Sequence, residues 1–254
     1  MQLIPPFSEK VAPVSKNPPP FWKMAIFGKN PKKVRKNGGS EKLRFNLSEL
    51  PELSYSEKLV AGVDEVGRGA LFGPVVAAAA ILPESCLSEL AAAGIRDSKQ
   101  LSKLQRFRLA AQIKAVALDW KIGFAATHEI DEINILQASL LAMKRAVLKL
   151  KVQPDLCLVD GKHSIPNLLM PQETLVRGDQ RSLVIAAASI IAKVWRDDLI
   201  SRLALKYPAY DLEANKGYGT GKHLSALQAL GPSPLHRLSF SPCRISAQNL
   251  SFEL

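Results

Sequence analysis

The sequence has few cysteines and lacks a long hydrophobic run. Its three cysteines, Cys86, Cys157 and Cys243, lie far apart and form no Cys-x-x-Cys pair, which argues against a disulfide framework or a zinc site. The longest apolar stretch, residues 75–82, is shorter than the roughly 18 residues of a membrane span. The first twenty residues are rich in proline and lysine and contain no apolar signal-peptide core. We therefore expect a cytoplasmic protein that does not engage a membrane.

Acidic residues are also scarce. The chain of 254 residues has 23 Asp and Glu against 34 Lys and Arg, which gives a formal net charge of +11. Such an excess suits a polyanionic partner such as nucleic acid, although a solvated basic surface would have the same composition. Residues 1–52 contain ten Lys and Arg against four Asp and Glu, a net +6, so the charge is concentrated near the N-terminus.

Residues 1–56 differ in composition from the rest of the chain. Seven prolines between residues 5 and 31 and the basic run at residues 32–36 interrupt any helical or strand periodicity. This composition predicts a mostly disordered basic extension. Two roles stay open for it, a nonspecific grip on phosphates or a variable tail. Residues 57–254 are expected to form one globular domain.

From Leu59 onward, short apolar runs that predict strands alternate with amphipathic stretches that predict helices. Ser102 and Gln105 have the spacing of a capping box, and Asn134 and Ser182 are positioned as helix caps. The expected strands are residues 59–63, 75–82, 120–127, 154–159 and 173–176, and the expected helices are residues 102–118, 134–150 and 182–205. Strands followed by alternating helices and strands predict an α/β fold with helices on the faces of a sheet.

Four carboxylates stand where expected strands end: Asp64, Glu65, Asp160 and Asp179. Each one alone is more often a cap or a turn former than a functional group. If they converge, they repel one another, and a site of this kind usually holds divalent cations. Hard oxygen ligands point to Mg²⁺ or Mn²⁺. Two such ions about 3.5–4 Å apart can activate water and stabilise a leaving oxygen in phosphodiester cleavage. The convergence itself cannot be derived from the spacing.

A series of motifs in this order resembles the ribonuclease HII family. It consists of residues 63–69 (VDEVGRG), 73–77 (GPVVA), 97–102 (DSKQLS), 130–136 (IDEINIL), 159–161 (VDG), 178–179 (GD), 185–194 (IAAASIIAKV), 196–197 (RD), 216–220 (KGYGT) and 236–237 (HR). The resemblance covers roughly residues 59–242. Because so many motifs occur in register, chance resemblance is excluded as an explanation.

The resemblance implies a fold and an activity. The implied fold is an RNase H-like mixed sheet flanked by helices, with a small C-terminal helical portion. The implied activity is that of a ribonuclease H, an endonuclease that hydrolyses the RNA strand of RNA–DNA hybrids and incises duplex DNA at embedded ribonucleotides. The reaction would use two Mn²⁺ or Mg²⁺ ions and leave 5′-phosphate and 3′-hydroxyl ends. The family's catalytic and metal-binding set falls on Asp64, Glu65, Asp160 and Asp179. We expect the protein to act as a monomer.

The resemblance also implies substrate-binding residues. Gly67, Arg68 and Gly69 would read the ribose 2′-hydroxyl and the adjacent phosphate, because glycine lets the backbone approach a ligand closely. Tyr218 matches a tyrosine that packs on the deoxyribose beside the junction. Further candidate phosphate contacts, each with an ion-paired surface residue as the alternative, are Arg68, Lys99, Lys193 and Lys216.

Some features depart from the pattern or compete with it. Asn215 stands where the family commonly has histidine before Lys-Gly-Tyr, and Asp97 is a rival carboxylate for which we expect a structural role. The four histidines, His128, His163, His223 and His236, have no metal-pair spacing. The alternatives are a ribonuclease HIII, disfavoured by Asp at position 179; a non-catalytic nucleic-acid-binding protein, disfavoured by the complete acidic set; and a junction resolvase or integrase-type nuclease.

Overall fold

A computed structural model describes residues 45, 49–55, 57–95 and 98–252 of the chain. These residues belong to one compact unit, Leu43–Leu254. Most of the predicted basic extension, and the rival carboxylate Asp97, lie outside the described residues. Within the described part, no helix combines the length and the apolar character that crossing a bilayer requires.

The centre of the compact unit is a five-stranded mixed sheet in the order β3-β2-β1-β4-β5. Its strands are β1 (Val60–Val66), β2 (Val75–Ile81), β3 (Asp119–Ala125), β4 (Leu156–Asp160) and β5 (Gln172–Leu175). The first three strands are antiparallel neighbours, whereas β4 runs parallel to both β1 and β5. Because β1 and β4 are parallel, their carboxyl ends meet at the same edge of the sheet.

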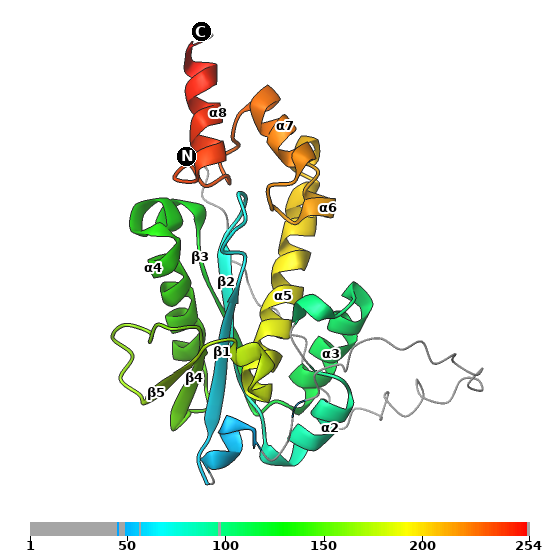
Figure 1. The fold of residues 1–254 in the computed structure, drawn as a ribbon, viewed down its shortest axis with the longest axis vertical. Helices are drawn as coiled ribbons and strands as arrows, with labels where there is room; N and C mark the ends of the chain where they lie inside the picture. Colours follow the sequence, from blue (N-terminus) through cyan, green and yellow to red (C-terminus); the bar gives the residue numbers. More distant parts are fainter. Residues whose placement is uncertain (1–44, 46–48, 56, 96–97, 253–254) are drawn as a thin grey trace, which may run out of the picture. The chain divides into compact units, whose positions relative to one another are not determined.

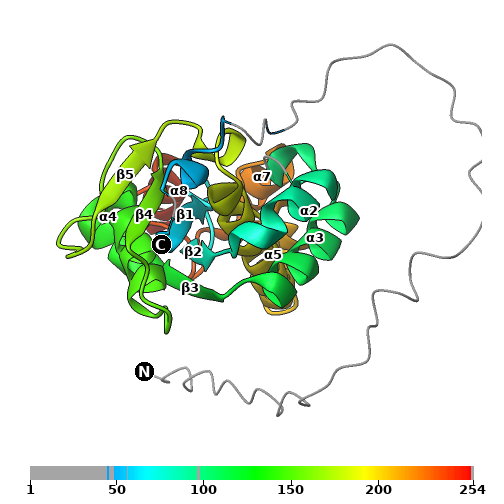
Figure 2. The same cartoon turned by 90° about the horizontal axis from the view of Figure 1, so that it is seen from below.

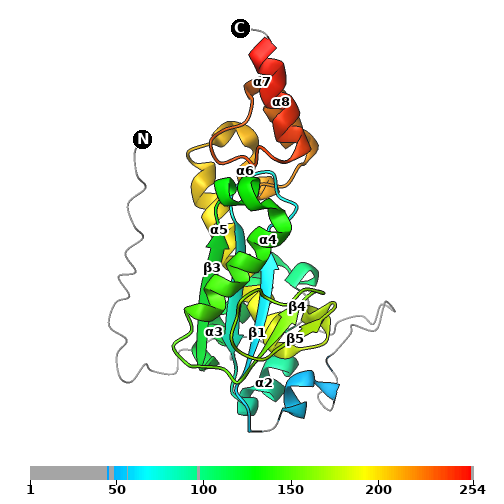
Figure 3. The same ribbon diagram turned by 90° about the vertical axis from the view of Figure 1, so that its left-hand side faces the viewer.

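Helices cover both faces of the sheet and extend beyond one end of it. The α-helices are α2 (Leu87–Ala92), α3 (Lys103–Val116), α4 (Thr127–Leu148), α5 (Leu183–Ala204), α6 (Leu212–Asn215), α7 (Gly221–Leu230) and α8 (Ser241–Phe252). Figures 1 and 2 show α4 on one face and α2, α3 and α5 on the other. In Figures 1 and 3 the helices α6 to α8 gather past the end of the sheet. This matches the predicted small C-terminal helical portion.

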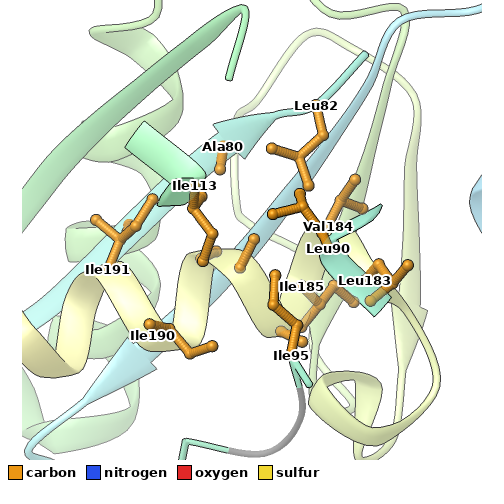
Figure 4. Packing of buried hydrophobic residues seen from close by; sticks show 14 of the residues in the cluster. Ala80, Leu82, Leu90, Ile95, Ile113, Leu183, Val184, Ile185, Ile190 and Ile191 are labelled. Atoms are coloured by element: carbon orange, nitrogen blue, oxygen red, sulfur yellow. The ribbon is translucent and has the colours of Figure 1, made fainter. Parts of the chain in front are cut away.

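The two faces of the sheet form two separate cores because successive side chains of a strand point to opposite sides. Ala61 and Val63 of β1 pack in the core under α4. Ala80 of β2 and Leu158 of β4 pack with α3 and α5, and Figure 4 shows this second core from close by. Gly62 lies on the α5 side, where a Cβ atom would collide with the backbone of Val184. The helix therefore lies directly on β1.

Short connecting helices complete the fold; α2 and those before residue 205 were not predicted, whereas short helical pieces were expected toward the C-terminal end. The connecting helices are η2 (Pro51–Ser54), η3 (Glu84–Cys86), η4 (Ser98–Gln100), η5 (Gly178–Gln180) and η6 (Pro208–Tyr210). The predicted strands and long helices are present, with ends shifted by a few residues. The Ser102–Gln105 capping box and the Ser182 cap are confirmed. The predicted α/β class is also confirmed.

The helix expected to begin at Asn134 begins earlier, at Thr127. Asn134 interrupts it with a φ of 65° and a ψ of 165°. Its Oδ1 accepts the backbone N–H groups of Leu136 and Gln137 at 3.0 and 3.2 Å. Asn134 therefore does cap a helix, the second half of α4, but a first half precedes it.

The described part of the predicted extension is packed rather than disordered. Leu50 and Glu52 are only 2% and 7% exposed. Glu52 accepts a 2.7 Å hydrogen bond from the backbone N–H of Leu183 at the start of α5, and Tyr55 donates to Glu173 of β5. The packed part of the chain thus starts before residue 57, because a carboxylate and a tyrosine fasten this segment to the domain.

Candidate active site

The carboxylates Asp64 and Asp160 come together through strand register. The parallel pairing of β1 and β4 matches Val63 with Val159, so the next residues, Asp64 and Asp160, lie side by side at the end of the pair. Val63 and Val159 both pack in the core under α4. Strand alternation then directs the two aspartates to the α5 face.

Glu65 completes a compact acidic group with these two aspartates. Ligand oxygens of Asp64, Glu65 and Asp160 all lie within 4.8 Å of one another. Asp64 is 6% exposed, and its Oδ1 accepts the backbone N–H of Glu65 at 2.7 Å. Asp160 accepts the backbone N–H of Gly178 at 2.6 Å. Arg68 contacts the Oε1 atom of Glu65 at 3.2 Å.

The environment of this acidic group opposes ionisation. Burial raises the pKa of Asp64 well above its usual range, and the charges of Glu65 and Asp160 raise it further. Burial also raises the pKa of Glu65 and that of Asp160. Loss of water and like-charge repulsion both favour the neutral acids. A divalent cation would reverse both effects, so these carboxylates fit a metal site.

Asp179, the fourth predicted carboxylate, lies next to this group but is not one of the three. It is 8% exposed, at η5. Its charge raises the pKa of Asp64, which places it close enough to interact. Its role as a metal ligand stays a prediction.

Arg237 holds the Gly-Arg-Gly turn (residues 67–69) from the interior side. Its side chain is fully buried. Nη2 donates to the carbonyl of Gly67 and Nη1 to the carbonyl of Arg68, both at 2.7 Å. Nε donates to the carbonyl of Gly73 at 3.0 Å. One guanidinium therefore fixes both ends of the segment that leads from β1 to β2.

Arg196 performs a similar function from α5 and is also fully buried. It donates to the carbonyls of Phe72, Pro74 and Lys216 at 3.1, 3.2 and 2.9 Å. Gly67 has a φ of +90°, and a Cβ there would collide with the Arg196 side chain. Glycine is therefore required at position 67 both for its backbone conformation and for the space that it leaves.

The same arrangement brings Tyr218 to the turn. Residues Ala70 and Tyr218 form an antiparallel bridge, and Leu71 N–H donates to Gly217 O at 2.7 Å. Lys193 Nζ lies 5.8 Å and Arg196 Cζ 5.5 Å from the centre of the Tyr218 ring. Two motifs about 150 residues apart in the sequence thus form one surface, as their proposed shared role requires.

Asn215 supports the turn that carries Tyr218. Its Nδ2 donates to Tyr210 O at 2.7 Å, and its Oδ1 accepts the Gly217 N–H at 2.7 Å. The departure from the family pattern at this position is therefore accommodated by an amide that uses both its donor and its acceptor.

The three candidate lysines differ in their surroundings. Lys99 is exposed, and its charge lowers the pKa of Asp160. Lys193 forms a 2.7 Å ion pair with Asp197. Lys216 lies 3.0 Å from Glu213 and donates to Ser201 Oγ at 2.6 Å. Lys99 is thus placed beside the acidic group, and the other two lysines lie in ion pairs with Asp197 and Glu213.

Two histidines that share no motif spacing meet in the C-terminal part. His223 and His236 are 0% and 2% exposed, and their Nε2 atoms lie 3.0 Å apart. They belong to no group of three metal-ligating side chains among the described residues. The sequence did not indicate the contact between the two histidines, nor the roles of Arg196 and Arg237, because each depends on groups that only the fold brings together.

One face of α5 connects these features in order. Val184 lies against Gly62, and Ser189 donates a hydrogen bond that lowers the pKa of Asp64. Arg196 lies against Gly67, and Ile200 against Gly73. Helix and strand therefore run alongside each other from the acidic group to the Gly-Arg-Gly turn.

Comparison with known proteins identifies a family. The sequence model described as ribonuclease HII matches residues 61–243. A ribonuclease HII from Nostoc sp. is 65% identical over 200 residues, which cover 79% of this chain and 89% of that protein. The crystal structure of the ribonuclease H2 from Pyrococcus horikoshii OT3 superposes with a TM-score of 0.66 at 27% identity, covering 76% of this chain and 98% of that one.

Ribonuclease HIII shares the fold at lower identity. A Bst-RNase HIII solved in complex with Mn²⁺ is 19% identical, with a TM-score of 0.62 over 92% of this chain and 81% of that one. That likeness shows the fold alone. The family match and the 65% identical relative are both ribonuclease HII, so the alternative of ribonuclease HIII is rejected.

Proposed function

The chain belongs to the ribonuclease HII family, and from this membership we propose that it cuts duplex DNA at embedded ribonucleotides as well as RNA–DNA hybrids. It is an endoribonuclease that hydrolyses the RNA strand of such hybrids. The observation that carries the proposal is the position of the acidic group and the Gly-Arg-Gly turn. Asp64, Glu65 and the turn lie on one continuous segment of β1 and its extension, Asp160 lies on the neighbouring strand β4, and Tyr218 is bridged to the segment at Ala70.

Asp64, Glu65 and Asp160, with Asp179 beside them, would hold two divalent cations, Mn²⁺ or Mg²⁺. Their oxygens are close together and their carboxyl groups are under electrostatic strain, which binding of positive charge relieves. Bound cations would supply Lewis-acid charge that activates water and stabilises the leaving oxygen, giving 5′-phosphate and 3′-hydroxyl ends. Lys99 adds positive charge next to Asp160, where a substrate phosphate would approach.

The Gly-Arg-Gly turn would read the ribose with its outer edge. Arg237 draws the carbonyl oxygens of Gly67 and Arg68 toward the interior. In a planar trans peptide the next N–H points the opposite way, so the N–H groups of Arg68 and Gly69 face outward. Arg68 and Gly69 are exposed. Successive outward N–H groups form an anion-binding surface, which suits the phosphate next to a 2′-hydroxyl.

Tyr218 would recognise the sugar after the ribonucleotide. A ring packed against a sugar favours deoxyribose, which lacks the 2′-hydroxyl. Together the turn and the ring would select an RNA-to-DNA junction, with incision on the 5′ side of the ribonucleotide. We also propose that the protein acts as a monomer in the cytoplasm. Each residue of the site comes from one compact unit, and all three cysteines are free and buried.

The test is cleavage of a DNA duplex that carries one ribonucleotide, compared with a long RNA–DNA hybrid. We expect Mn²⁺ or Mg²⁺ to support both reactions and EDTA to abolish both. Tyr218→Ala should raise the activation free energy of cleavage at the single ribonucleotide by about 1–3 kcal/mol more than that of hybrid cleavage. Tyr218→Phe, which retains the ring, is the matched control and should keep the wild-type ratio.

Three results would count against the proposal. Full activity in excess chelator would contradict the metal site. No incision at a lone ribonucleotide would contradict the extended substrate range. Equal losses on both substrates for Tyr218→Ala would contradict junction reading, and would leave the family's hybrid-cleaving activity untouched.

A further inference from the structure

We propose that His223 and His236 are positioning residues for Tyr218: they form a one-way chain of hydrogen bonds that ends on the Tyr218 carbonyl and sets the ring for junction recognition. The inference rests on the proposed role of Tyr218 in reading the junction. The ring nitrogens of both histidines bond within residues 218–236, and the mechanism uses neither of them.

The chain begins in the loop after α7. Ser233 N–H donates to His236 Nδ1 at 2.9 Å, and Ser233 Oγ also lies 2.9 Å from that nitrogen. His236 Nε2 lies 3.0 Å from His223 Nε2. His223 Nδ1 lies 2.9 Å from the carbonyl oxygen of Tyr218. Every ring nitrogen of the pair therefore has a partner.

These partners determine where each proton resides. A backbone N–H can only donate, so His236 Nδ1 accepts and the ring of His236 carries its proton on Nε2. That proton is donated to His223 Nε2, which leaves the proton of His223 on Nδ1. A carbonyl can only accept, so His223 Nδ1–H donates to Tyr218. Two neutral rings with defined tautomers satisfy the whole chain.

The environment of the pair supports neutral rings. Burial lowers the pKa of His223, and burial together with the charge of His223 lowers the pKa of His236 to about 4. The Tyr210 ring packs against both, with ring centres 6.0 and 4.7 Å away. A proton added to His223 Nε2 would face the N–H of His236 across 3.0 Å, and one added to His236 Nδ1 would face Ser233 N–H across 2.9 Å, so either would break the chain.

The chain acts on Tyr218 through its backbone. The Tyr218 carbonyl also accepts Thr220 N–H at 2.8 Å, and Tyr218 N–H donates to Asn215 O at 3.0 Å. His236 forms a bridge with Phe72. The histidine pair therefore links the segment after the Gly-Arg-Gly turn to the backbone of the residue that would read the next sugar.

Two substitutions at His223 separate the two hydrogen bonds of its ring. In His223→Asn the amide nitrogen can occupy the place of Nδ1, which keeps the donor to Tyr218 and removes the hydrogen bond with His236. In His223→Gln the amide reaches the place of Nε2, which keeps the hydrogen bond with His236 and removes the donor. The two variants are similar in polarity, so they form a matched pair.

The measurement is the ratio of single-ribonucleotide to long-hybrid cleavage for wild type, both His223 variants and Tyr218→Ala. We expect His223→Gln to lower this ratio about fivefold, which corresponds to about 1 kcal/mol for one hydrogen bond. His223→Asn should keep it within about twofold. A purely structural defect would lower both rates together and leave the ratio unchanged.

A second measurement tests the proton order independently of activity. Nitrogen NMR of the full chain at neutral pH should find the proton of His223 on Nδ1 and that of His236 on Nε2. The opposite tautomers would overturn the chain. An unchanged ratio in His223→Gln, or an equal fall in His223→Asn, would overturn the positioning role. If Tyr218→Ala itself leaves the ratio unchanged, junction reading fails and the positioning role fails with it.

Discussion

Two sets of buried charged side chains lie beside β1 and the segment that follows it. The two sets differ in the groups that they contact. At the acidic group, three carboxylates face one another within 4.8 Å. At the turn, Arg196 and Arg237 face backbone carbonyls, and each donates hydrogen bonds to three of them. The carboxylates resist ionisation because burial raises the pKa of all three, and neighbouring carboxylates raise the pKa of Asp64 and of Glu65 further. Burial and the charge of Arg196 lower the pKa of Arg237 only to about 9, so it remains protonated at neutral pH.

The difference distinguishes the candidate metal ligands from the arginines that support the structure. A buried charge whose hydrogen bonds are made contributes to a rigid structure, and removing it leaves its partners unsatisfied. A cluster of like charges lowers stability until a ligand of opposite charge binds. Neutralising members of the two sets should therefore have opposite effects on folding and on catalysis.

The largest effect should come from the acidic group. Asp64→Asn and Asp160→Asn should each lower the cleavage rate by about 10³-fold, since single electrostatic groups at reaction centres contribute on that order. In EDTA the variants should be as stable as wild type or more stable, because one repulsive charge is gone. Single-turnover cleavage and denaturant melts measure the two quantities. A variant that unfolds, or that turns over at a near wild-type rate, would break the contrast.

The arginine set should show the reverse pattern. Arg196→Met leaves three backbone carbonyls without their donor and should lower the free energy of unfolding by about 3 kcal/mol. Arg202→Met is the control on the same helix. Arg202 is half exposed and pairs with Asp198, so the change should cost less than about 1 kcal/mol. Equal melting temperatures for the two variants would show that Arg196 does not support the turn.

Lowering the pH should lower the stability of the folded protein through the histidine pair, in contrast to its effect on the acidic group. The pKa of His236 is lowered in the folded state to about 4 from 6.5, so acid favours the unfolded chain, which takes up protons first. Stability from this group is present above pH 6.5 and is lost as the pH falls toward 4, by at most about 3 kcal/mol. The nearby charge of Asp211 acts on His223 in the opposite direction.

The carboxylates respond to acid with the opposite sign, because their pKa values are raised and protonation favours the folded state. Comparing wild type with His236→Gln cancels their contribution. The stability advantage of wild type over His236→Gln in EDTA should shrink between pH 7 and pH 5. A constant difference across this range would mean that the histidines are not neutral in the folded protein.

The smallest effect should come from the charge outside the compact unit. Residues 1–42 contain nine Lys and Arg against two Asp and Glu. Deleting Met1–Lys42 should flatten the salt dependence of hybrid binding, and the logarithmic slope should fall by about 0.9 for each phosphate that the extension neutralises. Cleavage at low salt and the effects of Asp64→Asn and Arg196→Met should be retained. An unchanged salt slope would assign the extension a role other than phosphate binding.

The residues of the acidic half could be predicted from the sequence, from their positions at strand ends and from the family resemblance, whereas their convergence needed the fold. Alternation within β1 and β4 and the position of Asp64 and Asp160 at their ends are local patterns, and a parallel pairing is enough to bring them together. The capping box at Ser102 and the cap at Ser182 are also local. Asn134 shows the limit of such signals, since a cap was recognised but not the half-helix before it. That half is fixed by Glu129, which pairs with Arg145 sixteen residues later.

The role of the two buried arginines could not be predicted, because the carbonyl groups that they contact belong to residues distant in the chain. In a sequence, Arg196 and Arg237 resemble phosphate ligands or surface residues. Only the fold shows that backbone carbonyls surround them, all but that of Lys216 from residues more than a hundred positions away. His223 and His236 likewise meet only because the loop after α7 returns to it. Asp179 is intermediate: its motif placed it near the acidic group, but whether it binds metal depends on distances that no motif specifies.

The regular contact of α5 with β1 fixes the distance between the acidic group and the Gly-Arg-Gly turn. Ser189 touches the acidic group and Arg196 the turn that carries Tyr218. They are seven residues apart, two helical turns or about 10 Å. Under the proposed role of Tyr218, this helical spacing sets the distance between the acidic group and the ring that would read the sugar. One residue inserted between them would rotate Arg196 by about 100° away from its carbonyls. An insertion or deletion within this stretch would therefore separate the turn from its support.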